Sequence, residues 1–456
     1  MRYIILLGFS LLFFLTASCY IGEPGSDRAS DAALVTLYFG SPGTGIHAAT
    51  LTRAVTKAVP SDAASVKLTV TAPDMDTIEQ TVEVSTSDTV TVKVKKGTAR
   101  TFKIEAFDSA GTLLYTGSHT QDLADDTVTI AITAAYVGPP VYRYFAYLSS
   151  WSGNTITVAE INTATGALTP GTPMTHSNEP HCVGVDPSGQ YAYIGYGLQA
   201  VTTITNATVD KDTGSLTMGT TTATGPKPVF VAVHPNGKWA YVASYNDPPG
   251  LGDVRVHPIT NGILQVSTQT FTASGTLESP HAIAIHPNGN YLYIADYNND
   301  DTVTNNSQIR VCSINQTDGS LTLVQNWISG THSNPNDEVP TVAVHPNGKF
   351  LYGTYIDPGL SATCFHIFTI DQSNFQITSE TEPFNAALPI TYESVAVEPL
   401  GKFLYLVYST TGSEKVEIYS IDQTTGAVTY VSPLSPGSAF HTVNIGRTTV
   451  KAPATQ

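Results

Sequence analysis

A phrase that recurs five times between residues 180 and 405 constrains the fold of this chain more than any other feature. Each copy has an apolar run, a turn of the His-Pro-Asn-Gly type and an aromatic-rich run that ends in tyrosine. A period of about 50 residues built from strand-like segments is typical of a β-propeller, in which small sheets surround an axis. The closing tyrosines lie 48 to 59 residues apart and are Tyr193, Tyr241, Tyr293, Tyr352 and Tyr405.

Each repeat divides into four strand candidates, with the turn between the first and the second. In this turn Pro fixes φ for the first central position, and Gly accepts the left-handed conformation that returns the chain. The turn histidines are His234, His286 and His345, whereas two sister repeats have Asp186 and Glu398 at the same place. We therefore expect this position to carry structure rather than a shared ligand role.

The two ends of the repeat region determine the number of blades. Residues 144–150 have the pattern of a second strand without a first strand before it, and residues 441–445 have that of a first strand with nothing after it. We expect the C-terminal strand to complete the blade that begins near Tyr144, because this pairing removes exposed sheet edges. The sequence thus predicts a six-bladed propeller over residues 141–446 and a tail over 447–456.

Residues 33–137 form a different unit. About seven short segments with alternating apolar and polar residues are separated by turn signals, which is the pattern of an immunoglobulin-like sandwich. Gly138 and two prolines then mark a stiff junction. The predicted fold is all-β, with an N-terminal immunoglobulin-like β-sandwich followed by a six-bladed β-propeller closed by the C-terminal strand.

Residues 1–18 have the pattern of an export signal, since Arg2 precedes an apolar stretch and small residues lead to Cys19. The pattern resembles a bacterial lipoprotein signal, with Thr16 where Leu is usual. Cleavage would make Cys19 the lipidated start of a tether over residues 19–32. We expect a chain anchored to the membrane by lipid in the bacterial cell envelope, at the outer membrane or cell surface. Ordinary secretion or a periplasmic location is the alternative.

Composition narrows the range of partners. The net charge is −16, and such a chain repels phosphate backbones, so nucleic acid is not an expected partner. Besides Cys19, the cysteines are Cys182, Cys312 and Cys364, each inside a strand-like run. No Cys-x-x-Cys pair supports a zinc ribbon or a redox motif, so we expect buried thiols.

The repeats resemble the lactonase-type propellers, the group that includes bacterial 6-phosphogluconolactonase and the related YVTN repeats. The resemblance rests on the Pro-His start of the phrase, its Asp/His-Pro-Asn-Gly-Lys turn, the Tyr-Ile or Tyr-Val second strand and the Ile-Asp-x-x-Thr-Gly turn at residues 421–426. It covers residues 141–446 and implies lactone hydrolysis at the mouth of the channel. The family usually has seven blades, whereas these repeats predict six.

Six residues form one predicted ring where the first strands begin, on the face that carries the long loops. Three imidazoles and a carboxylate in this ring could bind a divalent metal or act as general acid and base. Equally, Pro-His could be only the way in which the repeat enters the strand. The Asn/Asp run at 298–301 is a weaker calcium candidate, because it lacks the spaced acids of a known loop. The ring is His181, Val229, His281, Pro340, Glu393 and His441.

Two functions remain open. The first is a binding scaffold whose long-loop face meets a protein or carbohydrate ligand. The alternative is a lactonase-like hydrolase that uses His181, His281, Glu393 and His441 as catalytic residues. The expected address outside the cytoplasm favours the scaffold, because the sugar phosphate that the resemblance implies as substrate is cytoplasmic. The sequence requires no cofactor for either function.

Overall fold

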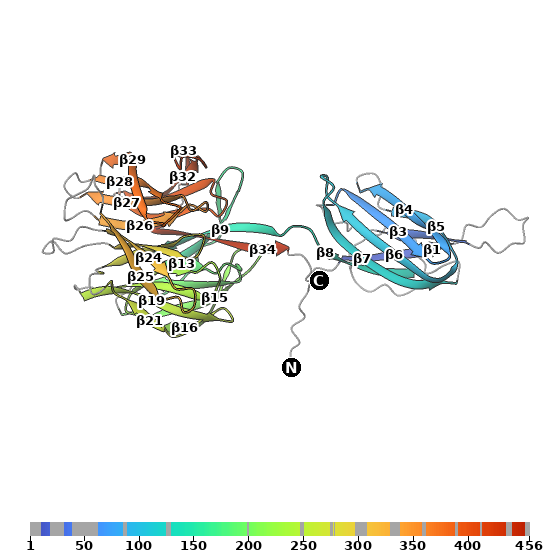
Figure 1. The fold of residues 1–456 in the computed structure, drawn as a ribbon, viewed down its shortest axis with the longest axis horizontal. Coiled ribbons are helices and arrows are strands. Elements are labelled where there is room, and N and C mark those ends of the chain that lie inside the picture. The colour runs from blue at the N-terminus through green and yellow to red at the C-terminus, as the bar shows by residue number, and fades with distance from the viewer. Residues whose placement is uncertain are drawn as a thin grey trace, which may run out of the picture. The chain divides into compact units, whose positions relative to one another are not determined.

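A computed structural model divides the chain into two compact units. The N-terminal unit comprises Met1–Val141 with Lys451–Gln456, and the repeat unit comprises Tyr142–Val450 (Figure 1). Nowhere in the described ranges is there a helix long and apolar enough to span a membrane. The structure describes residues 11–18, 32–38, 63–84, 89–124, 129–197, 200–246, 250–273, 277, 279–296, 308–328, 338–357, 362–387, 391–410, 413–434 and 440–451.

The N-terminal unit is an eight-stranded antiparallel arrangement with the order β4-β3-β6-β7-β8-β1-β2-β5. Strand β8 pairs with β1 along most of its length but with β7 only through Ala135 and Tyr136. It therefore joins two halves, one made of β4, β3, β6 and β7 and the other of β1, β2 and β5. The strands are β1 (Leu11–Ser18), β2 (Ala32–Tyr38), β3 (Ser65–Ala72), β4 (Met75–Glu83), β5 (Thr89–Lys95), β6 (Gly97–Phe107), β7 (Leu113–Leu123) and β8 (Thr129–Tyr136).

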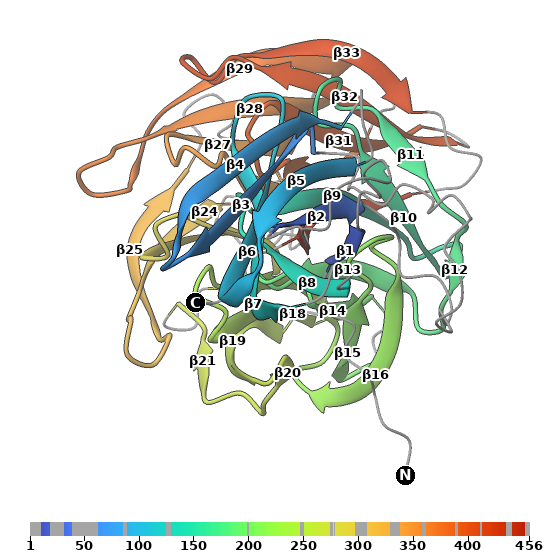
Figure 2. The same ribbon diagram turned by 90° about the vertical axis from the view of Figure 1, so that its right-hand side faces the viewer.

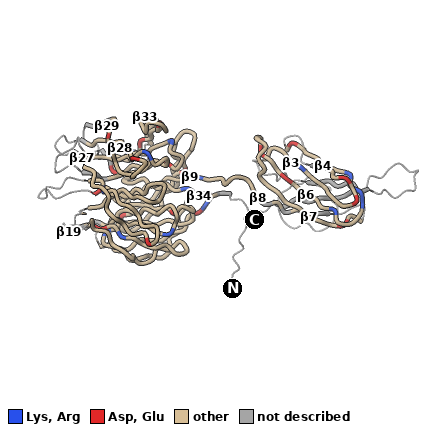
Figure 3. The backbone as a smooth tube through the Cα atoms, in the orientation of Figure 1, with Lys and Arg blue, Asp and Glu red and all other residues tan. Residues whose placement is uncertain are grey.

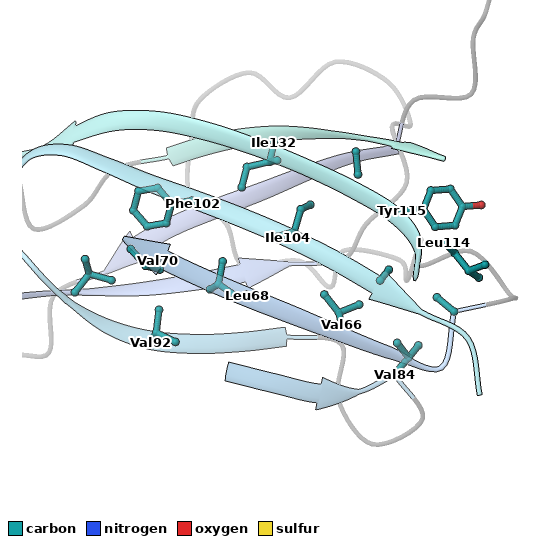
Figure 4. Packing of buried hydrophobic residues seen from close by; sticks show 14 of the residues in the cluster. Val66, Leu68, Val70, Val84, Val92, Phe102, Ile104, Leu114, Tyr115 and Ile132 are labelled. Atoms are coloured by element: carbon teal, nitrogen blue, oxygen red, sulfur yellow. The ribbon is translucent and has the colours of Figure 1, made fainter. Parts of the chain in front are cut away.

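Alternating apolar residues form the core of this unit. Leu68 from β3 and Phe102 from β6 meet Val92 from β5 and Ile132 from β8 in one buried cluster (Figure 4). Because successive side chains of a strand point to opposite faces, every second residue of β3 is buried between the halves. Burial of this face is what holds the unit together.

The N-terminus differs from the sequence prediction in one respect. Leu11–Ser18, the apolar part of the predicted export signal, is strand β1 and pairs with β8 and β2. Cleavage before Cys19 would remove this strand from the unit. Cys19 itself, and the tether up to residue 31, lie outside the described residues.

The described part of the repeat unit forms six antiparallel sheets, which surround one centre in Figure 2. The first three sheets contain β9 (Val141–Ser150), β10 (Thr155–Ile161), β11 (Leu168–Pro170), β12 (Met174–Thr175) and β34 (Thr442–Lys451); β13 (Pro180–Val185), β14 (Tyr191–Tyr196), β15 (Thr203–Val209) and β16 (Leu216–Ala223); and β17 (Pro228–Val233), β18 (Trp239–Asn246), β19 (Gly250–Thr260), β20 (Ile263–Leu264) and β21 (Gln269–Phe271).

The other three sheets repeat the same order of four strands. They contain β22 (Pro280–Ile285), β23 (Tyr291–Asp296), β24 (Gln308–Ile314) and β25 (Leu321–Trp327); β26 (Glu338–Val344), β27 (Phe350–Asp357), β28 (Ala362–Ile370) and β29 (Ile377–Ala387); and β30 (Thr391–Val397), β31 (Phe403–Thr410), β32 (Ser413–Ile421) and β33 (Val428–Leu434).

The C-terminal strand joins the sheet that begins near Tyr144, as the sequence predicts. Strand β34 lies beside β9, and the His441 amide donates to the Ser149 carbonyl at 2.8 Å. On its other sides β34 meets β30, where the Val443 amide donates to Ser394 Oγ, and β13 through Asn444. The strand continues to Lys451, so residues 447–451 are not the tail that was predicted.

A ring of tyrosine hydrogen bonds links each sheet to the next. Each donor is a second-strand tyrosine, and each acceptor is a backbone carbonyl in the turn between the third and fourth strands of the following sheet. The O···O distances lie between 2.8 and 3.3 Å. The last tyrosine closes the circle on the first sheet. The pairs are Tyr147–Gly214, Tyr193–Gly262, Tyr241–Gly319, Tyr293–Phe375, Tyr352–Gly426 and Tyr405–Gly166.

The turn histidines form a second set of links, which agrees with the structural role expected for them. His286 Nε2 lies 3.0 Å from the Gly348 carbonyl of the next sheet, and its Nδ1 accepts from the Asn288 amide at 3.2 Å. Because a carbonyl only accepts, Nε2 carries the proton and both ring nitrogens are engaged. His234 and His345 repeat this pattern.

The acids that replace histidine at this turn keep one half of the arrangement. The buried Glu398 carboxylate accepts from the backbone amides of Leu400 and Lys402, both at 2.6 Å. A carboxylate cannot donate to the next sheet, so only the link within the turn is retained. Cys182, Cys312 and Cys364 are buried thiols that form no disulfide, as predicted.

Candidate functional site

A β-bulge recurs at the start of the innermost strands and determines how the predicted ring is presented. The pairing between first and second strands shifts register between Pro180 and Cys182, and the same shift recurs around His281 and Glu393. Each ring residue in these strands is the extra residue of its bulge. Bulges re-aim side chains and are common beside active sites. The Pro-x start of the repeat therefore turns these side chains out of the regular ladder.

His181 interacts with two of the other three predicted catalytic residues. His181 on β13 acts electrostatically on both His281 on β22 and His441 at the start of β34. Thr442 Oγ1 also donates to the His181 carbonyl and so links the first strands of two sheets. The remaining candidate, Glu393, is half-buried on β30. Of the other ring positions, Val229 is a buried apolar residue, and the side chain of Pro340 lies outside the description.

The orientation of His181 is fixed by a backbone acceptor. Its Nδ1 lies 3.0 Å from the Val229 carbonyl on the neighbouring first strand. Since a carbonyl only accepts, Nδ1 carries the proton and the lone pair resides on Nε2. This tautomer can take a proton through Nε2, unlike the turn histidines, whose Nδ1 and Nε2 are both engaged.

All three imidazoles are neutral at pH 7. Burial lowers the pKa of His181 to about 4, and the nearby Lys227 lowers it further while the Val229 hydrogen bond opposes the shift. Burial also lowers the pKa of His281 to about 3 and that of His441 to about 4, with His181 adding to both shifts. Neutral imidazoles can accept a proton or a hydrogen bond, so the cluster can act as a base.

Lys227 is a site residue that sequence reasoning missed. It immediately precedes β17, is partly buried, and lowers the pKa of both His181 and His281. Its backbone φ is 46°, in the left-handed region that residues before proline rarely adopt, and its amide donates to the Val201 carbonyl at 2.8 Å. Glu179 has the matching position and a φ of 53° in the preceding sheet. The repeated phrase begins at its proline, so the residue just before it is not part of the pattern.

Trp151 also lies at the site, although it is not part of the repeated phrase. It follows β9 in the connection to β10, and its ring centroid is 4.2 Å from that of His441. Trp151 is 41% exposed, whereas the second-strand tyrosines are buried. An exposed indole beside a neutral imidazole offers a flat apolar surface to a ligand ring.

A buried ion pair holds the strand that carries His281. Arg310 Nη2 lies 2.8 Å from Asp296 Oδ2, and Asp296 Oδ1 accepts from the Ser279 amide at 3.0 Å. This pair fixes the chain just before β22. Charged residues are otherwise sparse along the repeat unit, as Figure 3 shows. The loops predicted to form the binding face lie mostly outside the described residues, which omit 247–249, 297–307, 329–337 and 358–361.

A divalent ion at the mouth is one of the uses that the sequence left open for the ring. Within the described ranges, the ring residues do not bring three donor atoms close enough together to hold an ion. The described ring residues are therefore suited to proton transfer and hydrogen bonding. Lys227 supplies the positive charge beside them.

Comparison with known proteins identifies the family. Residues 143–306 and 302–438 match the family described as "Lactonase, 7-bladed beta-propeller". Among solved structures, a putative 6-phosphogluconolactonase from Bacteroides uniformis has 18% identity and a TM-score of 0.47, over 65% of this chain and 83% of its own. A periplasmic gluconolactonase from Pseudomonas aeruginosa has 15% identity and a TM-score of 0.49, over 68% of this chain and 100% of its own. No curated protein matches the sequence.

The family match runs from the start of the repeat unit to residue 438 and covers more than half of the chain. It agrees with the Pro-His starts, the turns and the second-strand tyrosines described above. The chain therefore belongs to the lactonase family of β-propellers.

Proposed function

We propose that this protein hydrolyses a sugar lactone at the face where His181, His281 and His441 meet Lys227. The observation that carries the proposal is the pair of neutral imidazoles, His181 and His281, presented by the repeated bulge, with His441 nearby, in a chain of the lactonase family. Family membership supports the hydrolase, which the sequence held as the alternative, more than the binding scaffold.

The chemistry requires a base, an oxyanion partner and a proton donor. The Nε2 lone pair of His181 takes a proton from water while the water oxygen attacks the lactone carbonyl carbon. Lys227 stabilises the negative oxygen that develops. When the ring C–O bond breaks, the imidazolium returns its proton to the leaving oxygen. The sum is one lactone and one water giving one hydroxy acid, which ionises at neutral pH.

The surroundings of the cluster favour a sugar ring as substrate. Trp151 offers an exposed aromatic face beside His441, and sugars present apolar C–H faces that pack on such surfaces. Lys227 supplies one positive charge, which suits a lactone that carries a carboxylate or a phosphate group. We therefore place aldonolactones, with or without an anionic group, first among the substrates.

The test is a panel of sugar lactones, assayed with a pH indicator because ring opening releases a proton. The purified chain is expected to open at least one of them faster than buffer does and to saturate with substrate. Replacing His181, His281 and His441 together by Ala is expected to remove that activity. If lactones bind in calorimetry but none is opened, the binding scaffold replaces this proposal.

Other features of the account extend the proposal beyond the family assignment. Six blades are supported by the six described sheets and by the Tyr405–Gly166 bond that closes the tyrosine circle, although the family is described with seven.

We further propose an immunoglobulin-like spacer and a lipid anchor at Cys19 in the bacterial envelope. Incorporation of labelled palmitate by the chain, and its loss in Cys19→Ala, would support the anchor; incorporation that survives the substitution would refute it.

A further inference from the structure

A cysteine, a histidine and a glutamate converge on the fifth sheet, away from the mouth. Cys364 and His366 lie two residues apart on β28 and so share a face, and Glu382 lies on the adjacent strand β29. The Cys364 sulfur, a ring nitrogen of His366 and a carboxylate oxygen of Glu382 all lie within 4.8 Å of one another. This is the one such convergence among the residues that the structure describes.

The three side chains of this cluster differ in their exposure to solvent. Cys364 is 1% exposed and His366 is fully buried, whereas Glu382 is exposed. The shared face packs against the preceding sheet, where Cys364 and Phe368 belong to one cluster with Ile309. A carbonyl substrate is too large to reach a thiol buried in this way. Of the three side chains, that of Glu382 is the one that reaches solvent.

A carboxylate and two aromatic side chains surround the imidazole of His366. Glu380 Oε2 lies 3.8 Å from His366 Nδ1, and Trp327 Nε1 of the preceding sheet donates to the same oxygen at 3.4 Å. The Tyr355 ring packs beside the imidazole, with 4.7 Å between centroids. A carboxylate this close to the imidazole can help to orient the ring, as carboxylates near metal-binding histidines do.

We propose that Cys364, His366 and Glu382 bind one Zn²⁺ ion. Sulfur, imidazole nitrogen and carboxylate oxygen are all ligands that zinc takes, and water completes a tetrahedral site on the exposed side. The Cys364 thiol loses its proton to solvent as the Zn–S bond forms. Glu380 acts as a positioning residue. The ion joins the third and fourth strands of this sheet and is independent of the proposed hydrolysis.

Cobalt is the probe, because a Co²⁺ ion bound to a thiolate absorbs in the near ultraviolet. The purified full chain, stripped with chelator and titrated with Co²⁺, is expected to gain this charge-transfer band with one ion per chain, and Zn²⁺ is expected to displace it. Cys364→Ser is expected to lose the band. Cys312→Ser, which changes a buried thiol of the neighbouring sheet, is the matched control and is expected to keep it.

Two further variants keep the test valid should Cys364→Ser fail to fold. Glu382→Gln changes an exposed side chain and is expected to weaken Co²⁺ binding. Glu380→Gln is expected to weaken it by about 10–100-fold through the orientation of His366. Chelator is expected to lower the melting temperature of the zinc-loaded wild type but not that of Glu382→Gln. Absence of the band at saturating Co²⁺, or a band that Cys364→Ser retains, would overturn the proposal.

Discussion

His281 and His286 lie in the same sheet, at the two ends of strand β22, and their surroundings assign them to different tasks. His286 uses both ring nitrogens, one to the Gly348 carbonyl and one to the Asn288 amide. His281 lies on a bulge near His181 and Lys227. Burial lowers the pKa of both residues. The difference is therefore one of placement, since both ring nitrogens of His286 serve the turn whereas His281 is presented by a bulge beside His181 and Lys227.

The comparison is tested most strongly by removing the proposed base. His181→Ala is expected to lower kcat/KM for the best lactone by about 10²–10⁴-fold, the usual contribution of a general base. The melting temperature should change little, because a half-buried side chain with one hydrogen bond is lost. Initial-rate kinetics and thermal unfolding measure the two effects. Unaltered kcat/KM would remove His181 from the mechanism.

Acid should destabilise the fold through the mouth histidines. The pKa of His441 is about 4 in the folded chain, below the ordinary value of 6.5, so between these values the unfolded state binds a proton that the folded state does not. Stability is complete above pH 6.5 and falls toward pH 4, by about 3 kcal/mol from this buried residue alone. Urea unfolding at pH 7 and pH 4.5 measures the loss. His441→Gln should flatten the pH dependence, and an unchanged slope in that variant would contradict the assignment.

Lys227 is expected to act on the substrate rather than on the fold. Lys227→Met should cost about 1.5–3 kcal/mol of binding to an anionic lactone, or about 10–100-fold, the range for a hydrogen bond to a charged group. The loss should be smaller for a neutral lactone. Lys211→Met, at an exposed lysine paired with Asp212, is the matched control. Equal losses with both kinds of lactone would exclude a role in charge recognition.

The turn histidines should show the opposite behaviour. His286→Ala leaves the Asn288 amide and the Gly348 carbonyl without this partner, which is expected to cost about 1–3 kcal/mol of stability. Urea unfolding gives the change, and lactone kinetics below the transition should match the wild type. A stable His286→Ala protein would mean that the link between sheets contributes nothing.

The smallest expected effect concerns the tyrosine that closes the circle. Tyr405→Phe removes the bond to the Gly166 carbonyl and should cost about 1 kcal/mol. Tyr430→Phe, at a side chain that is 51% exposed, should be neutral in the same unfolding assay. If Tyr430→Phe were the more damaging change, the hydrogen bond would not be what joins the last sheet to the first.

The repeat explains how much the sequence could predict. Alternating apolar residues and Pro-Asn-Gly turns act locally, so strands, turn roles and the pairing of the C-terminal strand with the first sheet could be derived from the pattern. The partners of the second-strand tyrosines lie one sheet away, and no single repeat contains both ends of such a bond. Lys227 and Trp151 lie outside the repeated phrase, so the repeat gives no indication of them. Glu382 meets Cys364 only because β29 pairs with β28.

The most direct measurement sets His281→Ala beside His286→Ala in one lactone assay and one urea titration. The account predicts that His281→Ala loses kcat/KM by about 10²-fold or more while its unfolding midpoint stays near the wild type. It predicts that His286→Ala keeps kcat/KM and loses stability. Full activity in His281→Ala, with kcat/KM lost instead in a folded His286→Ala, would contradict the division between mouth and turn histidines.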